Sequence, residues 1–450
     1  MTLLNETHDP ARRSWVESAN LDGADFPIQN LPLGMFAPGE HAADALRPGM
    51  AIGDSVVDLR GLDEAGLLSR EAAAAVRAVR EGDRGLNGLL ALGNTPASKL
   101  RAQVSALLRA GGDGSLRESA ATWLHPMAGV TMALPCVIGD YTDFLTSFHH
   151  TERHGRFKNL ADPVPLVFHS LPVAYHGRAS SIRPSGTPVR RPNGQWREAD
   201  GTVKFGPVEA MDFELELAAV VGKGTTLAQP VNIDDAPTHI FGYTLLNDWS
   251  AKSVQWWEAM LGPFLGKSFM SSLSPWVVTA EALAPFATSA PARPGKAGAL
   301  LPYLHGVHDQ QAGGMRITME ASLQTQQMKD AGAAPVRIAA SQLSNLSWTF
   351  AQMLTHHTSN GCNLAPGDLM GSGTVSGERD DERACLTEIT SAGKQALVLP
   401  NGEQRLWLHD GDDITLRARA ETPGQVSIGF GPCTGRILPA VDYPLPAAAR

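Results

Sequence analysis

Acidic side chains alternate with apolar ones between Met211 and Gly222, where the sequence reads MDFELELAAVVG. Residues two apart share a face of a strand, so Asp212, Glu214 and Glu216 are predicted to lie on one face. Carboxylates about 7 Å apart on that face would repel one another. The following AAVV suits a buried strand, and an acidic face that runs into a buried strand favours a cation site. A solvated face is the commoner explanation for such a segment taken alone.

Two further segments place carboxylates beside apolar runs. IGDYTDF carries Asp140 and Asp143, and LLNDW carries Asp248 where an apolar strand would end. Carboxylates that converge from strand ends suit a hard cation such as Mg²⁺ or Ca²⁺.

Cysteine and histidine spacing does not indicate zinc. Cys136, Cys362, Cys385 and Cys433 are far apart and share no zinc-ligand spacing, so reduced structural thiols are expected and a soft-ligand site is not.

Other polar residues have open interpretations. His150 of the pair His149-His150 is as compatible with catalysis as with structure. The pair His356-His357 is predicted to stabilise a helix C-terminus. Lys267, in LGPFLGKSF, either reaches an anionic oxygen or lies on the surface.

The elements that position these residues can be outlined from periodicity. Residues 25–36 and 50–59 look extended, and residues 63–110 carry apolar residues at helical intervals, interrupted near GNTP at 93–96. Strands and turns dominate after residue 125, apart from a predicted helix over 343–357. A small β-rich unit with helices is therefore expected over residues 1–125.

The bulk properties exclude several classes of protein. The formal net charge of −9 over 450 residues does not provide the basic surface that nucleic acid needs. No apolar run approaches the ~20 residues of a membrane helix. The N-terminal stretch lacks the apolar core of a signal peptide, so a cytoplasmic protein is expected.

Many uncommon strings together resemble the fumarylacetoacetase family, in order from near residue 25 to near residue 440. They are DFPIQNLPLGMF, IGDYTDF, YHGRASS, SGTPVRRPNGQ, ELE, LLNDWSA, LGPFLGKSF, SPWVV, LTHHTSNGCNLAPGDL, SGTVSG and IGFG. The resemblance implies a mostly β fold with α+β character. It implies a small SH3-like N-terminal domain over residues 1–125 and a mixed β-roll catalytic domain over residues 126–450, in a protein that is usually dimeric.

The resemblance also implies the site. The family's metal ligands fall on Asp143, Glu214, Glu216 and Asp248. Its catalytic groups fall on His150, Glu388, Lys267 and Gln255. Its substrate-binding groups fall on Tyr175, Gln255, Thr374 and Lys158.

The implied reaction is metal-dependent hydrolysis of a carbon–carbon bond in a small 1,3-diketo acid. It is that of 4-fumarylacetoacetate to fumarate and acetoacetate, the last step of tyrosine and phenylalanine catabolism. A relative that cleaves another diketo acid or an acylpyruvate, a metal-dependent decarboxylase or isomerase, and a non-catalytic metal-binding scaffold are the alternatives. His150 with Glu388 favours hydrolysis, because decarboxylation needs no activated water.

The chain departs from the family pattern on the substrate side. Leu145 and Ala259 or Met260 replace tyrosines, and Lys252 replaces an arginine. Lysine gives up bidentate carboxylate recognition. The stretch before LGPFLGKSF is also one residue shorter than in the family. Alignment around the deletion leaves His149 an alternative to His150, and Arg156 is an alternative to Lys158.

Overall fold

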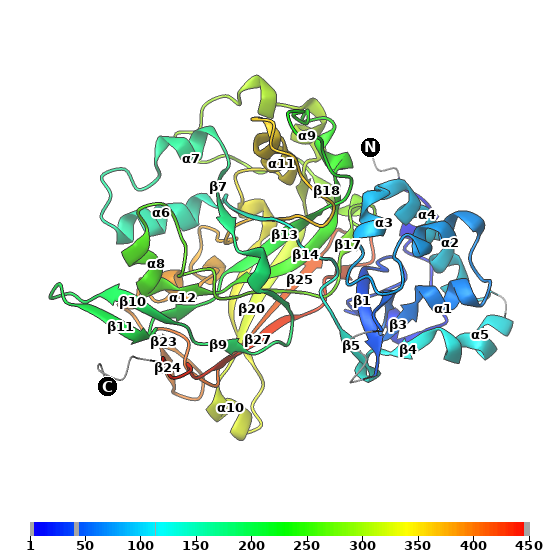
Figure 1. The fold of residues 1–450 in the computed structure, drawn as a ribbon, viewed down its shortest axis with the longest axis horizontal. Coiled ribbons are helices and arrows are strands. Elements are labelled where there is room, and N and C mark those ends of the chain that lie inside the picture. Colours follow the sequence, from blue (N-terminus) through cyan, green and yellow to red (C-terminus); the bar gives the residue numbers. More distant parts are fainter. Residues whose placement is uncertain (1–3, 40–44, 113, 445–450) are drawn as a thin grey trace.

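A five-stranded antiparallel sheet organises the N-terminal part of the chain in this computed structural model, which describes residues 4–39, 45–112 and 114–444 (Figure 1). The strand order is β4-β3-β2-β1-β5. The bounds are β1 (Leu33–Pro38), β2 (Arg47–Ile52), β3 (Ser55–Asp58), β4 (Leu124–Pro126) and β5 (Val130–Met132). The extended segment predicted over 50–59 is a hairpin of β2 and β3, which turns at Gly53 with φ 56°.

Helices cover this sheet, as the helical periodicity over 63–110 predicts. They are α1 (Leu59–Glu64), α2 (Arg70–Arg77), α3 (Asn87–Ala91), α4 (Asn94–Leu108) and α5 (Ser115–Ser119). The interruption falls where it was expected, because Gly93 separates α3 from α4 with φ 79°. Leu89, Leu100 and Val104 share one apolar core with β1–β3. Short 3₁₀ turns are η1 (Glu6–His8), η2 (Glu17–Asn20), η3 (Ala120–Thr122) and η4 (Met127–Gly129).

The larger part of the chain contains an eight-stranded mixed sheet. Its order is β7-β6-β22-β13-β14-β16-β8, and β17 pairs with β14. The bounds are β6 (Tyr141–Leu145), β7 (Val173–Gly177), β8 (Ile182–Pro184), β13 (Leu215–Val221), β14 (Ile240–Asp248), β16 (Ser271–Leu273), β17 (Val278–Thr279) and β22 (Leu369–Gly371). Strand β22, late in the sequence, is inserted between β6, to which it is parallel, and β13. Every residue of β13 and β14 is buried, so this sheet is covered on both faces.

A six-stranded sheet packs against it, with the order β21-β20-β25-β27-β9 and β26 beside β25. The bounds are β9 (Val189–Arg190), β20 (Ile317–Gln324), β21 (Val336–Gln342), β25 (Asp413–Ala420), β26 (Ile428–Gly429) and β27 (Cys433–Leu438). Alternate residues of β20 are buried, and Met319 and Leu323 share a core with Leu217 and Leu245 of the larger sheet.

Short strand pairs and helices surround the two sheets (Figure 1). The remaining strands are β10 (Asn193–Arg197), β11 (Val203–Pro207), β12 (Met211–Asp212), β15 (Ser250–Ala251), β18 (Ala287–Thr288), β19 (Gly314–Met315), β23 (Leu397–Val398) and β24 (Gln404–Arg405). The helices are α6 (Phe148–Phe157), α7 (Leu166–Ser170), α8 (Lys252–Glu258), α9 (Val307–Ala312), α10 (Gln326–Asp330), α11 (Phe350–Thr358) and α12 (Leu386–Ile389). The 3₁₀ turns are η5 (Ala179–Ser181), η6 (Ala236–Thr238), η7 (Ala284–Phe286), η8 (Pro302–Leu304), η9 (Leu343–Asn345) and η10 (Asp380–Glu382).

The helix predicted over 343–357 begins later than the periodicity suggests. Residues Leu343–Asn345 form η9, and α11 begins only at Phe350. Thr349 caps that helix and exchanges hydrogen bonds with Gln352 in a capping box, which fixes the start.

The predicted fold class, a mostly β chain with a small N-terminal β unit and a larger mixed-sheet unit, is confirmed. The domain boundary at residue 125 stays a prediction, and β5 of the N-terminal sheet extends to Met132. None of the described helices has the length and apolar character that a bilayer crossing would require.

Candidate active site

Three carboxylates from neighbouring strands of the larger sheet converge. Asp143 lies on β6, Glu216 on β13 and Asp248 at the end of β14, and one oxygen of each lies within 4.8 Å of the others. All three side chains are buried. Gly371 of β22 leaves room for them, because a Cβ atom there would lie 2.5 Å from Asp143 Oδ1. The sheet thus brings together three of the four acids that the family resemblance assigns to a metal ion.

Glu216 shows that these residues fit a cation. Both of its carboxylate oxygens are buried without a hydrogen-bond partner among the described residues. Burial and the charges of Asp143, Asp248 and Glu214 raise the pKa of Glu216 well above its usual value. A buried carboxylate without a partner is costly, and a divalent ion held by these oxygens would remove that cost.

The other two carboxylates of the cluster have partners that orient them. The Tyr141 hydroxyl donates to Asp143 Oδ2 at 2.6 Å, and the Gly373 amide donates to Asp143 Oδ1 at 3.2 Å. Asp248 accepts from the Tyr175 hydroxyl at 2.7 Å and from Ser271 Oγ at 3.1 Å. Burial and the charge of Asp248 raise the pKa of Asp143 to about 8. Each acid therefore keeps an oxygen near the centre of the cluster while its other contacts fix its direction.

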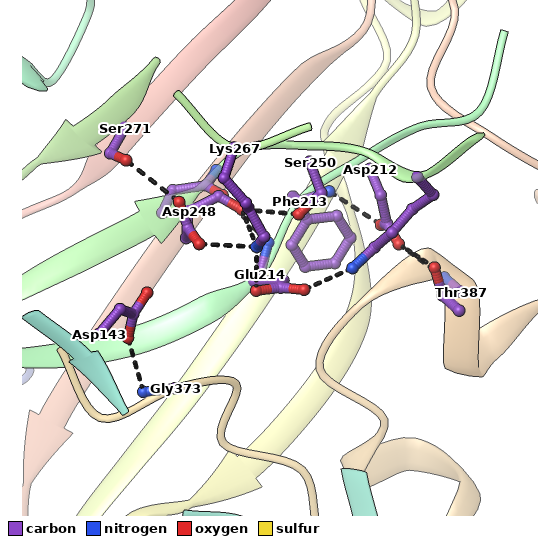
Figure 2. A network of polar contacts seen from close by, with 12 residues as sticks. Asp143, Asp212, Phe213, Glu214, Asp248, Ser250, Lys267, Ser271, Gly373 and Thr387 are labelled. Atoms are coloured by element: carbon purple, nitrogen blue, oxygen red, sulfur yellow. Dashed lines mark hydrogen bonds and ion pairs between the residues drawn. The ribbon is translucent and has the colours of Figure 1, made fainter. Parts of the chain in front are cut away.

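Glu214 is paired with two lysines, and Figure 2 shows it with Lys267 beside Asp143 and Asp248. Its Oε1 accepts from Lys252 Nζ and its Oε2 from Lys267 Nζ, each at 2.5 Å. Lys267 Nζ also lies 2.6 Å from Asp248 Oδ2, and so joins Glu214 to the cluster. Burial alone would raise the pKa of Glu214, but the charges of Lys252 and Lys267 hold it well below its usual value. Its assignment as a metal ligand stays a prediction.

An imidazole–carboxylate pair lies beside this charge network. His150 is in the first turn of α6, which begins where the Ser147 hydroxyl accepts from the His150 amide at 3.1 Å. Its Nδ1 hydrogen-bonds to Oε1 of Glu388, in α12. Arg153 Nη1 donates to Glu388 Oε2 at 3.0 Å, and Ser376 Oγ donates to Oε1 at 2.9 Å.

These contacts keep Glu388 ionised. Burial favours the neutral acid, but the charges of His150 and Arg153 and the hydrogen bonds outweigh it, and the pKa of Glu388 is lowered. An ionised carboxylate fixed against Nδ1 holds the imidazole in one orientation, with Nε2 as its other donor or acceptor. His149, the alternative to His150, makes ring contact with Phe148.

Asp212 is not one of the acids of the cation cluster, although the predicted alternation holds, because Met211, Phe213, Leu215 and Leu217 all lie in one apolar core. The strand predicted over Met211–Gly222 is divided into β12 and β13, with Phe213 and Glu214 between them. Strand β12 pairs with β15 instead of continuing the large sheet. The carboxylate of Asp212 accepts from the backbone amides of Leu386 and Thr387 at 2.7 and 2.8 Å, at the start of α12. These contacts satisfy the Asp212 carboxylate at α12, outside the cluster of Asp143, Glu216 and Asp248.

The remaining residues assigned by resemblance are distributed around this centre. Gln255, on α8, packs against Gly266, and its Oε1 is buried without a hydrogen-bond partner among the described residues. Thr374 is buried in the loop after β22, directly after Gly373, which has φ 72°. Lys158 caps the C-terminal end of α6, where partial burial and the charge of Lys252 lower its pKa. Their roles stay predictions.

Cysteine and histidine also meet, against the expectation drawn from their spacing. His150, His154, Cys385 and Glu388 have one ligand atom each within 4.8 Å of the others. The histidines lie on α6 and the other two residues at α12, more than 200 residues later. Spacing along the chain could not show a cluster formed by two distant elements.

Several contributors to the site were missed in the sequence. Tyr141 stands two residues before Asp143, and Arg153 three residues after His150, so strand and helix periodicity could have found them. The contacts of Asp212 with α12 and of Ser376 with Glu388 carry no local signal. The arrangement combines a cation site, an oriented imidazole and a buried ammonium group, which suits attack by an activated water on a carbonyl carbon.

Comparisons with known proteins agree with this arrangement. The family model described as "Fumarylacetoacetate (FAA) hydrolase C-terminal" matches residues 141–438, and "Fumarylacetoacetase N-terminal" matches residues 29–135. The chain is 41% identical over 440 residues to a fumarylacetoacetase of Oryza sativa subsp. japonica, with 95% of this chain and 98% of that protein covered. It is 41% identical to that of Bos taurus (94% and 98% covered) and 39% identical to that of Homo sapiens (93% and 98% covered).

Proposed function

This chain belongs to the fumarylacetoacetase family, and from that premise we propose that it hydrolyses 4-fumarylacetoacetate to fumarate and acetoacetate. It would thereby perform the last step of tyrosine and phenylalanine catabolism. The observation that carries the proposal is the juxtaposition of the His150–Glu388 pair with the buried carboxylates and Lys267.

A divalent cation, Mg²⁺ or Ca²⁺, is the cofactor that the oxygen-only donor set fits. Asp143, Glu216 and Asp248 would hold it, with Glu214 as the fourth ligand. When bound, such an ion acts as a Lewis acid toward the diketone oxygens and lowers the energy of the enolate that leaves.

His150 acts as the general base in this proposal. Its Nδ1 is occupied by Glu388, so Nε2 takes the proton of a water molecule that attacks the ketone carbonyl carbon. The oxyanion then collapses to the new carboxyl group of fumarate as the carbon–carbon bond breaks. The electron pair of that bond goes to the other fragment as an enolate, which takes the proton back from His150 and becomes acetoacetate. Arg153 and Ser376 hold Glu388 and so act on His150 through it.

Lys267 and Gln255 are assigned to the oxyanion formed by water attack. The ammonium of Lys267 is buried, and the charges of Asp248, Glu214 and Glu216 outweigh burial and raise its pKa, so it stays cationic. Gln255 lies next to Gly266 and hence beside Lys267. A preorganised cation in a buried site stabilises developing negative charge more effectively than water does.

The substrate's polar groups are assigned to Tyr175, Thr374 and Lys158. Lys158 is the cationic group assigned to a substrate carboxylate, and partial burial and the charge of Lys252 both lower its pKa. Lys252, however, is fully buried against Glu214. This pairing, with Leu145 and Ala259 in place of tyrosines, favours the second candidate function: cleavage of another 1,3-diketo acid or of an acylpyruvate.

A product assay tests these proposals. The purified full-length protein is incubated with Mg²⁺ or Ca²⁺ and with fumarylacetoacetate or a panel of acylpyruvates, and products are identified by NMR. Fumarate and acetoacetate support the first function, and cleavage of an acylpyruvate alone supports the second. Carbon dioxide release points to a decarboxylase. Near-normal turnover of His150→Ala with the metal still bound would refute the histidine's role.

We also propose a homodimer in the cytoplasm. Support for the dimer comes from an apolar loop after α8, in which the exposed fractions of Met260 and Leu261 are 95% and 100% and that of Phe264 is 65%. A second copy would cover it, and sedimentation equilibrium would test this. The four free cysteines suit a reducing compartment.

A further inference from the structure

A second group of metal-binding side chains lies where α6 meets α12. His150 and His154 are one helical turn apart on α6, with ring centroids 4.2 Å apart and planes inclined by 33°. Cys385 directly precedes α12, and Glu388 lies within that helix. One ligand atom from each of the four residues lies within 4.8 Å of the others. Donors from two packed elements therefore converge on one point.

His154 has an unused ligand atom that the proposed hydrolysis does not need. Its Nε2 atom is buried and has no hydrogen-bond partner among the described residues. A buried nitrogen without a partner carries the cost of its lost hydration. The mechanism proposed above uses His150 and Glu388 but neither His154 nor Cys385, so the histidine nitrogen and the thiol are both available.

The donor types identify the ion. Two imidazoles, one thiolate and one carboxylate form the ligand set that Zn²⁺ takes in four-coordinate sites, whereas Mg²⁺ and Ca²⁺ prefer oxygen alone. We propose that His150, His154, Cys385 and Glu388 form a second metal site, selective for Zn²⁺ or a similar soft divalent ion. It is separate from the oxygen cluster of Asp143, Glu216 and Asp248.

Binding of a metal ion in this second site requires that existing bonds of its ligands be replaced. The Cys385 thiol must lose its proton, and the hydrogen bond between His150 and Glu388 must give way to two metal bonds. Arg153 Nη1 donates to Glu388 Oε2 at 3.0 Å and Ser376 Oγ donates to Oε1 at 2.9 Å, so the ion would share Oε1 with Ser376 and lie near a positive charge. His154 is only partly buried, whereas the other three residues are buried, so the ion enters past His154.

The consequence for activity rests on the proposed function. A metal ion that takes His150 and Glu388 removes the base that accepts the proton of water. Soft divalent ions are therefore inhibitors that act next to the catalytic cation without displacing it.

Cobalt spectroscopy tests the site without reference to activity. Co²⁺ is titrated into the full-length protein saturated with Mg²⁺, and absorption of thiolate-to-cobalt charge transfer and of tetrahedral Co²⁺ is followed. One equivalent should produce both signals in the unaltered protein. Cys385→Ser should lose the charge-transfer signal, and His154→Val should weaken binding by about 10–100-fold.

Cys362→Ser is the matched control, because Cys362 is half-buried and outside the cluster. It should leave both signals unchanged. Absence of a thiolate signal in the unaltered protein, or a signal that survives Cys385→Ser, would overturn the site. If the protein cleaves no diketo acid, these spectra still decide the question, so failure of the function is distinguished from failure of the site.

Inhibition is then measured with Zn²⁺ at saturating Mg²⁺. Cys385→Ser and His154→Val should keep the basal hydrolysis rate and require about 10–100-fold more Zn²⁺ for half-inhibition. Equal inhibition of all three proteins would place the inhibitory zinc at the oxygen cluster and overturn the inhibitory role.

Discussion

Asp212 Oδ2 accepts two hydrogen bonds from Thr387, one from the backbone amide at 2.8 Å and one from the hydroxyl at 2.6 Å (Figure 2). A strand residue thereby holds the N-terminus of the four-residue helix that carries Glu388. A carboxylate at that end also complements the helix dipole. The position of Glu388, and through it the orientation of His150, depends on Asp212.

Replacement of Asp212 should therefore affect both stability and turnover. Asp212→Ala removes the acceptor of three buried hydrogen bonds from α12 and of one from the Phe213 amide, and should lower the free energy of unfolding by about 1–3 kcal/mol. It should also lower kcat, because Glu388 loses its fixed position. Asp212→Asn should keep part of the stability and part of the turnover. Urea unfolding and steady-state kinetics measure these effects. Unchanged kcat in a folded Asp212→Ala protein would show that α12 is held in other ways.

Glu388→Gln tests the orientation of the imidazole. The amide cannot accept from His150, Arg153 and Ser376 as the carboxylate does, so kcat should fall by about 10²–10⁴-fold with little change in KM. Glu378→Gln, at an exposed nearby position, is the control and should keep normal kinetics. If Glu388→Gln instead raised KM and left kcat normal, Glu388 would act in substrate binding and not in catalysis.

Removal of divalent metal should abolish activity and lower thermal stability. Glu216 keeps two buried oxygens without partners among the described residues when no ion is bound. Added Mg²⁺ or Ca²⁺ should restore turnover and stabilise the fold by about 2.7 kcal/mol at 100 times its dissociation constant. Chelation, activity recovery and calorimetric melting measure this. Glu216→Gln should show little metal-dependent stabilisation, and a full response in that variant would contradict the cluster.

The metal-free protein should lose stability as pH rises from about 4 to about 8. The pKa of Asp143 is raised to about 8 by burial and by Asp248, while the unfolded chain titrates near 4. The folded state therefore binds more protons than the unfolded state in this window, and stability falls as pH increases, by at most about 1.4 kcal/mol per pH unit for this group. Urea unfolding in chelator measures the slope. Asp143→Asn should make the free energy of unfolding depend less on pH. A free energy of unfolding that increases with pH in the unaltered protein would contradict the prediction.

Gly266→Ala should disturb the proposed oxyanion groups without replacing either of them. A Cβ at residue 266 would lie 2.6 Å from Gln255 Cβ and 2.8 Å from its backbone nitrogen, so α8 must shift. We expect a clear loss of kcat in steady-state assays. Gly298→Ala, where no atom lies within 4 Å of the added carbon, should be neutral. Equal kcat values for Gly266→Ala and Gly298→Ala would show that Gln255 does not contribute to catalysis.

Much of the fold could be predicted from local patterns. Helical periodicity over 63–110 gave the helices and their interruption at Gly93, and the apolar runs before Asp248 and after Glu216 indicated buried strands. The alternation at Met211–Gly222 predicts one continuous strand, whereas the structure has β12 and β13 separated by Phe213 and Glu214, and Asp212 bonds to α12. No local pattern contains that partner.

The candidate site could be predicted from the sequence only in part, for the same reason. The resemblance placed acids, His150 and Glu388 on particular positions, but their partners come from elsewhere in the chain. Glu388 is 238 residues from His150. The pairing of Glu214 with Lys252 and Lys267 depends on how α8 and the loop before β16 lie against the segment before β13. Contacts of this kind follow from tertiary packing, which a single sequence does not display.

The insertion of β22 between β6 and β13 constrains how the molecule is made. A ribosome must extend the polypeptide beyond residue 371 before the gap in the middle of the large sheet can be filled. Until then β6 and β13 each present an unpaired edge, the kind of surface on which incomplete chains associate. Closure of so long a loop is slow. We therefore expect refolding to be limited by docking of this strand, and chains shortened before residue 369 to aggregate.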